Sequence, residues 1–366
     1  MEKLKIVIVS ANCHPFLSPR AHRSTELAKE LSKRGYNVHL YSLLGNYDYS
    51  KIAERTGITF KNLGNSRFGL QDNTQNRNRN IIYRAFARFL GKFFAFPYIE
   101  LTYLVKKQIS KEKDIDVLIT IAHPHSIHWA ILLLKKKNYK CWIADCGDPF
   151  MGDPFNFHPF YFKYVEKKWC KKVDFITIPF EKGKSGYYPE FRDKIKVIPQ
   201  GFNFDEVKLA KYEVNSIPTF AYSGTIYENK RDPLKFLEYL SILKFDFKFI
   251  VYTKSKKYFE RYRLDLGDKL QIKDYIPRTE LIYELSKMDF LINIKNNSEV
   301  QLPSKLIDYY LSGRPILEIA TSFDEQQNFE SFIKRDYTSQ LFKQDVSNYD
   351  IKNVTSNFIN LFWKCI

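Results

Sequence analysis

The first half of the chain alternates short apolar segments with longer segments of helical periodicity. Continuous apolar runs predict strands at residues 4–10, 36–42, 116–121, 140–144, 173–178 and 195–199. Runs without polar alternation are typical of parallel strands that are covered on both faces. After the first strand, apolar residues recur at helical spacing, and Gly35 stands where that helix is expected to end. This order predicts a doubly wound sheet, which binds ligands at the carboxyl ends of its strands.

The same alternation starts again after residue 200. It predicts strands at 218–223, 247–252, 269–274, 288–294 and 314–319. A chain of 366 residues is also longer than one hydrophobic core usually supports. We therefore expect an α/β protein with two Rossmann-like domains, residues 1–200 and 201–349, which face a central cleft. The tail, 350–366, is amphipathic and is expected to form a helix that packs back on the first domain.

The chain shows no sign of a membrane span or of secretion. It has no stretch of about 18 uncharged apolar residues, which a transmembrane helix needs. The apolar run near the N-terminus, 6–9, has the length of a strand and is too short for a signal peptide. The five cysteines are scattered without disulfide or zinc spacing. These features predict a cytoplasmic protein in a reducing compartment.

The charge balance is strongly basic. The chain carries 58 basic and 41 acidic residues, so its formal net charge is +17. Such a balance favours polyanionic partners, namely nucleic acid, anionic lipid or phosphorylated substrates. The alternative is a compositional bias of the genome, because Lys, Asn, Ile, Phe and Tyr are all abundant. Composition alone leaves both interpretations open.

One segment of the first half, 77–113, combines basic and aromatic residues. Basic residues recur every four positions, and aromatic residues occupy another helical face. The two sets are Arg84, Arg88 and Lys92, and Phe86, Phe89 and Phe93. This pattern is typical of an interfacial helix that lies on anionic lipid, although a core-packed helix with a basic solvent face would look similar. It predicts a peripheral location on the inner face of the cytoplasmic membrane.

The segment 302–317 is the strongest candidate for a binding site. A proline and a glycine bracket a predicted helix of about three turns. Lys305 and Asp308 project together from one side near its N-terminus, and Ser304 lies in the same turn. A helix N-terminus with an added cation suits a diphosphate, and a carboxylate one turn further can accept hydrogen bonds from a ribose diol. Spacing alone fits a surface Lys–Asp pair equally well.

This segment resembles the signature of glycosyltransferase family 4 and its relatives, which have the GT-B fold. That signature contains two glutamates separated by seven residues. The second binds the donor ribose, and Asp308 stands at its position. The first contacts the donor sugar and would fall at Val300, while Glu299 is one place away. The resemblance implies either that Glu299 takes over this contact through a local shift or that the contact is lost.

Two further segments of the second half resemble the same family. The first, 220–240, is similar to the strand, glycine loop and helix whose glycine and basic residue approach the diphosphate. The second, 274–294, is similar to the segment whose loop covers the nucleobase. The positions that the resemblance assigns to the donor are Gly224, Arg231, Tyr275 and Ile276.

The first half matches the family more loosely. Residues 116–137 are similar to the strand, loop and helix that carry the family's active-site histidine, and His123 and His125 compete for that role. His123 is favoured slightly because it comes first after the strand. The loop after the first strand lacks the family's paired glycines. Arg20 and Arg23 follow that loop, and they are candidates to contact an anionic acceptor or the donor phosphate.

The resemblance implies a retaining sugar transfer from a nucleoside-diphosphate sugar, with uridine as the default nucleotide and guanosine open. It implies neither a metal nor another cofactor. The basic aromatic helix suggests a lipid-linked glycan or a lipopolysaccharide as acceptor. Competing classes are a sugar-nucleotide 2-epimerase, an inactive nucleotide-sugar-binding homologue and a nucleic-acid-binding protein. The last explains only the charge, because zinc-finger spacing and RNP-like aromatic motifs are absent from the sequence.

Overall fold

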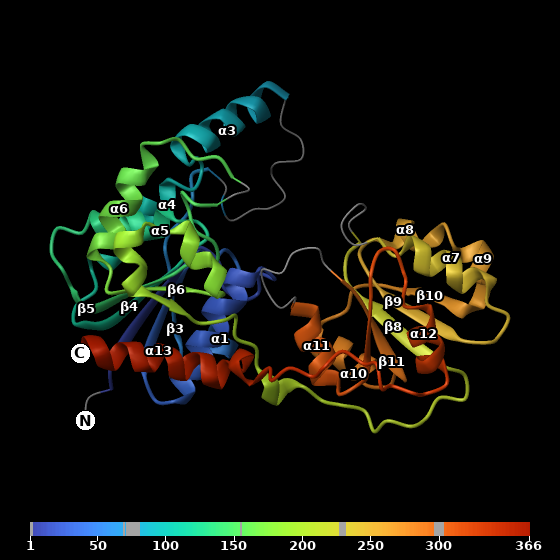
Figure 1. Ribbon diagram of the computed structural model, residues 1–366. Helices are drawn as coiled ribbons and strands as arrows, with labels where there is room; N and C mark the ends of the chain where they lie inside the picture. The colour runs from blue at the N-terminus through green and yellow to red at the C-terminus, as the bar shows by residue number, and fades with distance from the viewer. Residues whose placement is uncertain (1–2, 69, 71–80, 154–155, 227–231, 296–303) are drawn as a thin grey trace. The chain divides into compact units, whose positions relative to one another are not determined.

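The chain forms two compact units (Figure 1). The computed structural model describes residues 3–68, 70, 81–153, 156–226, 232–295 and 304–366, without the side chains of 81–87 and 304. The first unit combines Met1–Phe202 with Asn348–Ile366, and the second is Asn203–Ser347. The boundary expected after residue 200 falls in the same connecting segment.

The first unit is built on a seven-stranded parallel sheet in the order β3-β2-β1-β4-β5-β6-β7. The strands are β1 (Lys5–Ser10), β2 (Asn37–Ser42), β3 (Thr59–Asn62), β4 (Ile115–Ile121), β5 (Tyr139–Asp145), β6 (Phe175–Ile178) and β7 (Ile195–Val197). All six predicted strands are present. The edge strand β3 was not predicted, because its sequence TFKN leaves none of its side chains fully buried.

Helices cover both faces of this sheet (Figure 1). They are α1 (Pro19–Lys33), α2 (Ser50–Thr56), α4 (Glu100–Ile109), α5 (Ser126–Leu132), α6 (Phe162–Lys172) and α13 (Ile351–Cys365). Helix α3 (Ile81–Phe94) projects away from the sheet. Along β1, Val7 and Val9 belong to one buried cluster, whereas Ile6 and Ile8 belong to the other. A strand buried on both faces has no polar alternation, which is the pattern that the sequence showed.

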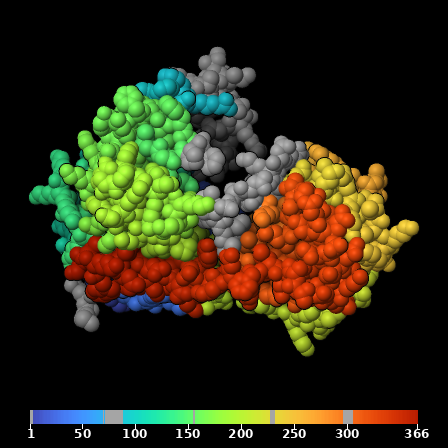
Figure 2. All heavy atoms as spheres, in the orientation of Figure 1, coloured from blue at the N-terminus to red at the C-terminus, as the bar shows by residue number. Residues whose placement is uncertain are grey.

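The C-terminal helix α13 belongs to the first unit. Asp350 caps its N-terminus by accepting a hydrogen bond from Lys352 N at 3.0 Å. Its apolar stripe, which includes Val354, Phe358 and Phe362, is buried in the same cluster as Ile6 and Ile8. The opposite side is open to solvent and forms the dark red band of atoms in Figure 2. The tail therefore completes the core of the unit in which the chain begins.

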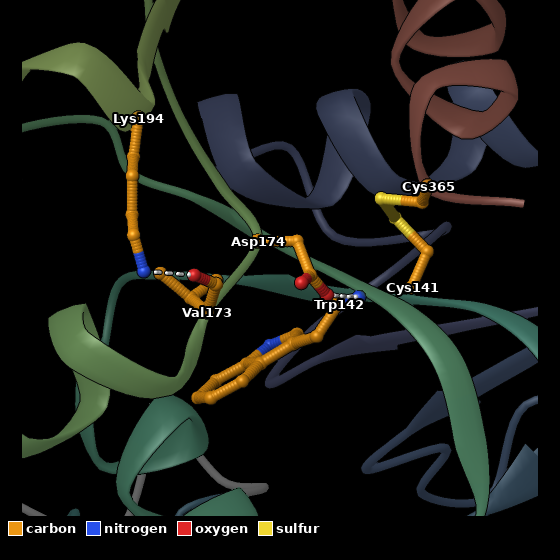
Figure 3. The surroundings of a disulfide bond; sticks show 6 residues. All are labelled: Cys141, Trp142, Val173, Asp174, Lys194 and Cys365. Atoms are coloured by element: carbon orange, nitrogen blue, oxygen red, sulfur yellow. Dashed lines mark hydrogen bonds between the residues drawn. A yellow bond between two sulfur atoms is a disulfide. The ribbon is translucent and has the colours of Figure 1, made fainter.

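A disulfide joins Cys365 at the end of α13 to Cys141 on β5 (Figure 3). The Cα atoms are 5.5 Å apart, and the two residues are separated by 224 positions in the sequence. Next to it, Asp174 accepts a hydrogen bond from Trp142 N at 2.8 Å. The sequence shows no disulfide spacing, so this pair was not predicted. Local spacing cannot show this pair, because only the return of the tail brings the two residues together.

The second unit is built on a five-stranded parallel sheet in the order β10-β9-β8-β11-β12. The strands are β8 (Thr219–Ser223), β9 (Lys248–Tyr252), β10 (Leu270–Lys273), β11 (Phe290–Ile294) and β12 (Ile316–Ile319). The helices are α7 (Leu234–Ile242), α8 (Lys256–Glu260), α9 (Arg263–Leu266), α10 (Arg278–Leu285), α11 (Ser304–Ser312) and α12 (Gln326–Ile333). The predicted class, α/β with two doubly wound sheets, is confirmed.

Candidate functional site

In the second unit, the carboxyl end of β8 is shaped by a glycine. Gly224 follows the last residue of β8 and has φ +144°, a conformation that residues with a side chain rarely adopt. A β-carbon there would lie 3.1 Å from Tyr222 Oη. The Gly224 amide donates a hydrogen bond to Tyr252 O at 3.0 Å, which anchors the turn to β9. The backbone at this strand end can therefore approach a ligand closely.

Helix α11 is fixed to the same edge of the sheet by one tyrosine. The hydroxyl of Tyr309, buried completely, accepts a hydrogen bond from Ser223 N at 2.7 Å and donates to Ile292 O at 3.2 Å. These bonds hold the helix against the end of β8 and the middle of β11. One turn earlier, the half-buried Lys305 places its ammonium 5.0 Å from the centre of the Tyr222 ring. Its charge thus lies beside the strand that Gly224 ends.

Asp308 on α11 forms an ion pair that the sequence did not predict. Its Oδ1 accepts a hydrogen bond from Arg278 Nε at 2.5 Å, and the side chain of Asp308 is 13% exposed. Burial raises the pKa of Asp308 to about 6, although Arg278 opposes the shift. A carboxylate has about four acceptor positions, so pairing with one arginine leaves capacity for a diol.

The loop after β10 carries the two predicted base contacts. Tyr275 is 59% exposed, and Lys254 Nζ lies 4.9 Å from the centre of its ring. Ile276 is half-buried. An exposed ring at a strand end can stack on a base. The predicted base contacts of both residues, mostly through backbone atoms, stay predictions.

Some of the predicted donor residues lie outside the described residues. These are Arg231 and Glu299, together with the side chain of Ser304. The assignment of the first motif glutamate therefore stays a prediction, and so does the phosphate contact of Arg231.

In the first unit, both candidate histidines follow β4, but their environments differ. His123 is exposed, whereas His125 is 2% exposed, and their ring centres are 5.3 Å apart. Partial desolvation lowers the pKa of His123, against the opposing charges of Asp148 and Asp153. His123 is thus a neutral imidazole at pH 7 that is accessible to a ligand. Burial lowers the pKa of His125 much further, and its ring packs at 5.1 Å from Phe150.

The two predicted arginines have different environments. Arg23 is 2% exposed and binds Asp145 through two hydrogen bonds, Nε to Oδ2 at 3.2 Å and Nη2 to Oδ1 at 2.9 Å. It also donates to the carbonyls of Pro199 and Ile198. Its guanidinium is therefore committed to the interior, which corrects the prediction that it meets a ligand. Arg20 is partly exposed, with its Nη1 3.4 Å from Asp145 Oδ2, and its phosphate contact stays a prediction.

Asp145 and Arg278 are partners of predicted site residues, and the sequence interpretation missed both of them. Asp145 ends β5 and accepts a further hydrogen bond from Thr177 Oγ1 at 2.7 Å. Burial alone would raise the pKa of Asp145, but Arg23 and Arg20 lower it below the usual value. An acidic residue directly after an apolar strand was the available signal. Arg278 carried no such signal, because only the fold brings it to Asp308.

Helix α3 presents aromatic and basic side chains to solvent, and its contact with lipid stays a prediction. Phe89 and Phe94 are more than half exposed, and Arg88 and Lys92 are exposed as well. Phe93 is half-buried and packs on Phe89, with ring centres 4.7 Å apart. The side chains of Arg84 and Phe86 lie outside the described residues.

A second segment joins this surface. Lys92 Nζ lies 4.7 Å from the centre of the Phe157 ring, and the hydroxyl of Tyr161 donates a hydrogen bond to Phe93 O. Phe157 and Phe160 are 67% and 71% exposed. We call the side chains Phe89, Lys92, Phe94, Phe157 and Phe160 the aromatic surface. Within the described parts of the chain, no helix is long and apolar enough to cross a membrane.

Comparison with known proteins identifies the fold. The chain is similar to a glycosyltransferase from Rickettsia africae, with a TM-score of 0.65 and 14% identity over 100% of this chain and 99% of that one. It is also similar to the lipopolysaccharide outer core galactosyltransferase WaaB, with a TM-score of 0.58 and 12% identity over 99% and 100%. A third similar structure is the E. coli trehalose-6-phosphate protein bound with UDP-2-fluoro glucose, with a TM-score of 0.60 and 14% identity over 99% of each chain.

The chain matches no protein-family model and no curated protein. Identities of 12–14% over whole chains establish a shared fold and leave the activity to be argued from the site. The fold is therefore GT-B, as the resemblance in the second half predicted.

Proposed function

We propose that the protein is a glycosyltransferase that moves a sugar from a nucleoside-diphosphate sugar, with UDP as the nucleotide, to a lipid-linked glycan or lipopolysaccharide. The observation that carries this proposal is the edge formed by Gly224, Lys305 and Asp308 at the carboxyl ends of β8 and β11. The diphosphate, the ribose and the base of the donor then each have partners at one edge of the sheet in the second unit. A structural neighbour with bound UDP-2-fluoro glucose supports the choice of uridine.

Each group at this edge has a distinct task in the proposed reaction. The amides at the start of α11 and the Lys305 ammonium stabilise negative charge on the departing diphosphate. Asp308 accepts hydrogen bonds from the ribose diol while Arg278 orients its carboxylate. Tyr275 and Ile276 cover the base. His123 belongs to the first unit and not to this edge; the task that we propose for it, to position the sugar for transfer with retention, comes from the family resemblance. We propose that this transfer needs neither a catalytic metal nor a cofactor.

A transfer assay tests the proposal. Purified protein is mixed with labelled UDP-glucose, UDP-galactose, UDP-N-acetylglucosamine or GDP-mannose and with isolated bacterial membranes. We expect label from one uridine donor to enter the organic-extractable fraction. Conversion of the donor to an isomeric nucleotide sugar would identify an epimerase instead. The absence of turnover with every donor, together with retained nucleotide binding, would identify an inactive homologue.

Nucleotide affinity should rise as the pH is raised through about 6. Asp308 has a pKa of about 6, so it is mostly protonated at pH 5 and ionised at pH 7. Ionisation turns its ribose contacts into charge-assisted hydrogen bonds, which we expect to strengthen UDP binding about tenfold. Calorimetric titration at several pH values measures this change. Ionisation of the UDP phosphates affects the wild type and an Asp308→Asn variant equally. The variant's affinity should therefore depend less on pH than that of the wild type. Parallel profiles for the two proteins would exclude the role of Asp308.

The lipid-linked acceptor requires contact with the membrane, which we assign to the aromatic surface. Basic residues near anionic lipid contribute about 1 kcal/mol each, and aromatic side chains bury apolar area at the interface. A Phe89→Ala, Lys92→Gln variant should therefore bind anionic vesicles at least about fivefold more weakly than the wild type. Vesicle sedimentation at low salt measures the difference.

Phe342 provides the control for this experiment. It is an aromatic residue of the second unit that is 83% exposed, so Phe342→Ala should leave vesicle binding unchanged. Equal binding of the wild type to neutral and anionic vesicles, or equal loss in both variants, would contradict the assignment.

A further inference from the structure

Three potential metal ligands meet inside the first unit, behind the loop that carries His123. His125 precedes α5, His128 lies on α5, and Cys146 follows β5. All three are at most 2% exposed. One ligand atom of each residue lies within 4.8 Å of the corresponding atoms of the other two. Residues from two separate parts of the chain thus converge with nitrogen and sulfur donors.

The distance between two of the donors fits coordination. Cys146 Sγ and His128 Nε2 are 3.4 Å apart. Zinc binds sulfur at about 2.3 Å and imidazole nitrogen at about 2.0 Å. For an ion at these distances from both atoms, the S–Zn–N angle would be about 100°, close to the tetrahedral value. The same separation also permits a thiol–imidazole hydrogen bond, so this distance alone does not decide.

The opposite nitrogen of His128 has a partner that fixes its role. Nδ1 lies 2.8 Å from Thr120 Oγ1, which also accepts a hydrogen bond from Trp142 Nε1 at 2.8 Å. The Thr120 hydroxyl itself donates to Ile143 O at 3.5 Å. Because the hydroxyl proton of Thr120 points to Ile143 O, the Thr120 oxygen accepts a hydrogen bond from His128 Nδ1–H. The lone pair of Nε2 then faces Cys146, which is the arrangement of a metal-binding histidine with an orienting partner.

His125 supplies the independent observation. Neither of its ring nitrogens makes a hydrogen bond of normal geometry with a described residue, although the backbone of Asp148 lies near the ring. Leaving a buried polar atom without a partner costs about 1–3 kcal/mol, so such atoms usually have a function or a ligand. The ring packs beside His128, with centres 5.5 Å apart and planes at 77°. Two imidazoles and a thiol therefore converge in the interior of the first unit.

The surrounding charge also suits a cation. A divalent ion with one thiolate and two neutral imidazoles carries a net charge of +1. The carboxyl group of Glu166 is fully buried and close enough to Cys146 to act on it electrostatically. Its ionised form would balance the remaining charge, which a buried site requires.

We propose that His125, His128 and Cys146 bind one zinc ion, which fixes the loop between β4 and α5 and thereby the position of His123. Zinc accepts this mixture of borderline nitrogen and soft sulfur ligands and completes its coordination with a water molecule. Three protein ligands and one open position are otherwise the set of a catalytic zinc, but the burial of all three residues assigns this ion a structural role in the first unit. This proposal does not depend on the proposed sugar transfer, because its tests measure metal and not turnover.

Metal analysis of the purified protein tests the site. After removal of any affinity tag and dialysis, we expect about one zinc ion per chain in the wild type. Cys146→Ser and His128→Ala should contain less than about a tenth of that amount. Cys13→Ser is the matched control, because Cys13 is also buried but belongs to the other core cluster, and it should retain the metal.

Cobalt substitution covers the case in which a ligand variant fails to fold. In wild-type protein stripped with a chelator, cobalt(II) should produce the near-ultraviolet absorption of a cobalt–thiolate bond, and zinc should raise the melting temperature. Thr120→Val keeps all three ligands and should weaken zinc binding by about 10- to 100-fold. Zinc below about a tenth of an ion per chain in the wild type, without cobalt–thiolate absorption, would overturn the proposal.

Discussion

Replacing Lys305 by alanine is expected to lower the rate of sugar transfer by about 100- to 1,000-fold. The ammonium lies 5.0 Å from the Tyr222 ring, at the strand end where Gly224 lets the backbone approach a diphosphate. Negative charge grows on that diphosphate as the sugar departs, so a fixed cation there stabilises the transition state more than the bound donor. The loss should therefore appear mainly in kcat, with a smaller rise in KM.

Two variants make the Lys305 experiment specific. Lys305→Arg keeps the charge and should retain more activity than the alanine variant. Lys235→Ala removes an exposed lysine that pairs with Glu238 on α7, and it should leave the rate unchanged. The free energy of unfolding should change by less than about 1 kcal/mol in Lys305→Ala, because a cation–π contact such as that with Tyr222 contributes no more than this at a partly exposed site. A normal kcat/KM in a folded Lys305→Ala protein would refute the assigned role.

Replacing Asp145 by alanine should destabilise the first unit by about 3–5 kcal/mol. Asp145 and Arg23 have side chains that are each 2% exposed, and they are joined by two hydrogen bonds. Removal of the carboxylate would leave the Arg23 guanidinium buried without its counter-charge. Arg23 also lies 5.0 Å from the Phe358 ring on α13, so the damage should extend to the packing of the C-terminal helix.

Chemical denaturation measures this effect against a matched pair. Glu190 and Lys167 form an ion pair whose side chains are 47% and 44% exposed, and Glu190→Ala should cost less than about 1 kcal/mol. The double replacement Arg23→Met, Asp145→Leu removes both charges and should recover much of the lost stability. If Asp145→Ala unfolds at the same denaturant concentration as the wild type, the ion pair does not stabilise the first unit.

The strands could be predicted because strands that are buried on both faces consist of consecutive apolar residues. Both faces of β1 and β11 are covered, so their sequences are continuous apolar runs. The edge strand β3 has only partly buried or exposed side chains and carried no such pattern. The helix around Lys305 and Asp308 was predictable from its bracketing proline and glycine.

Contacts between distant residues could not be predicted in the same way. Asp308 pairs with Arg278 thirty positions away, and Cys141 pairs with Cys365 across 224 positions. Both pairs depend on how elements pack, which periodicity does not report. The same limit applied to the histidines, because His123 is exposed and His125, only two positions later, is buried. Arg23 was misassigned for this reason, since it lies on α1 and its partner Asp145 lies on β5.

Calorimetric titration of the wild type and of Lys305→Ala with UDP tests most directly whether the second unit binds a nucleoside diphosphate. We expect one UDP per chain, a dissociation constant between about 1 μM and 1 mM, and at least about tenfold weaker binding by Lys305→Ala. UMP should bind more weakly than UDP to the wild type, because it lacks the second phosphate that Lys305 neutralises. Absence of binding of both UDP and GDP at millimolar concentration, or equal binding by the two proteins, would contradict a nucleotide-sugar site at Lys305 and Asp308.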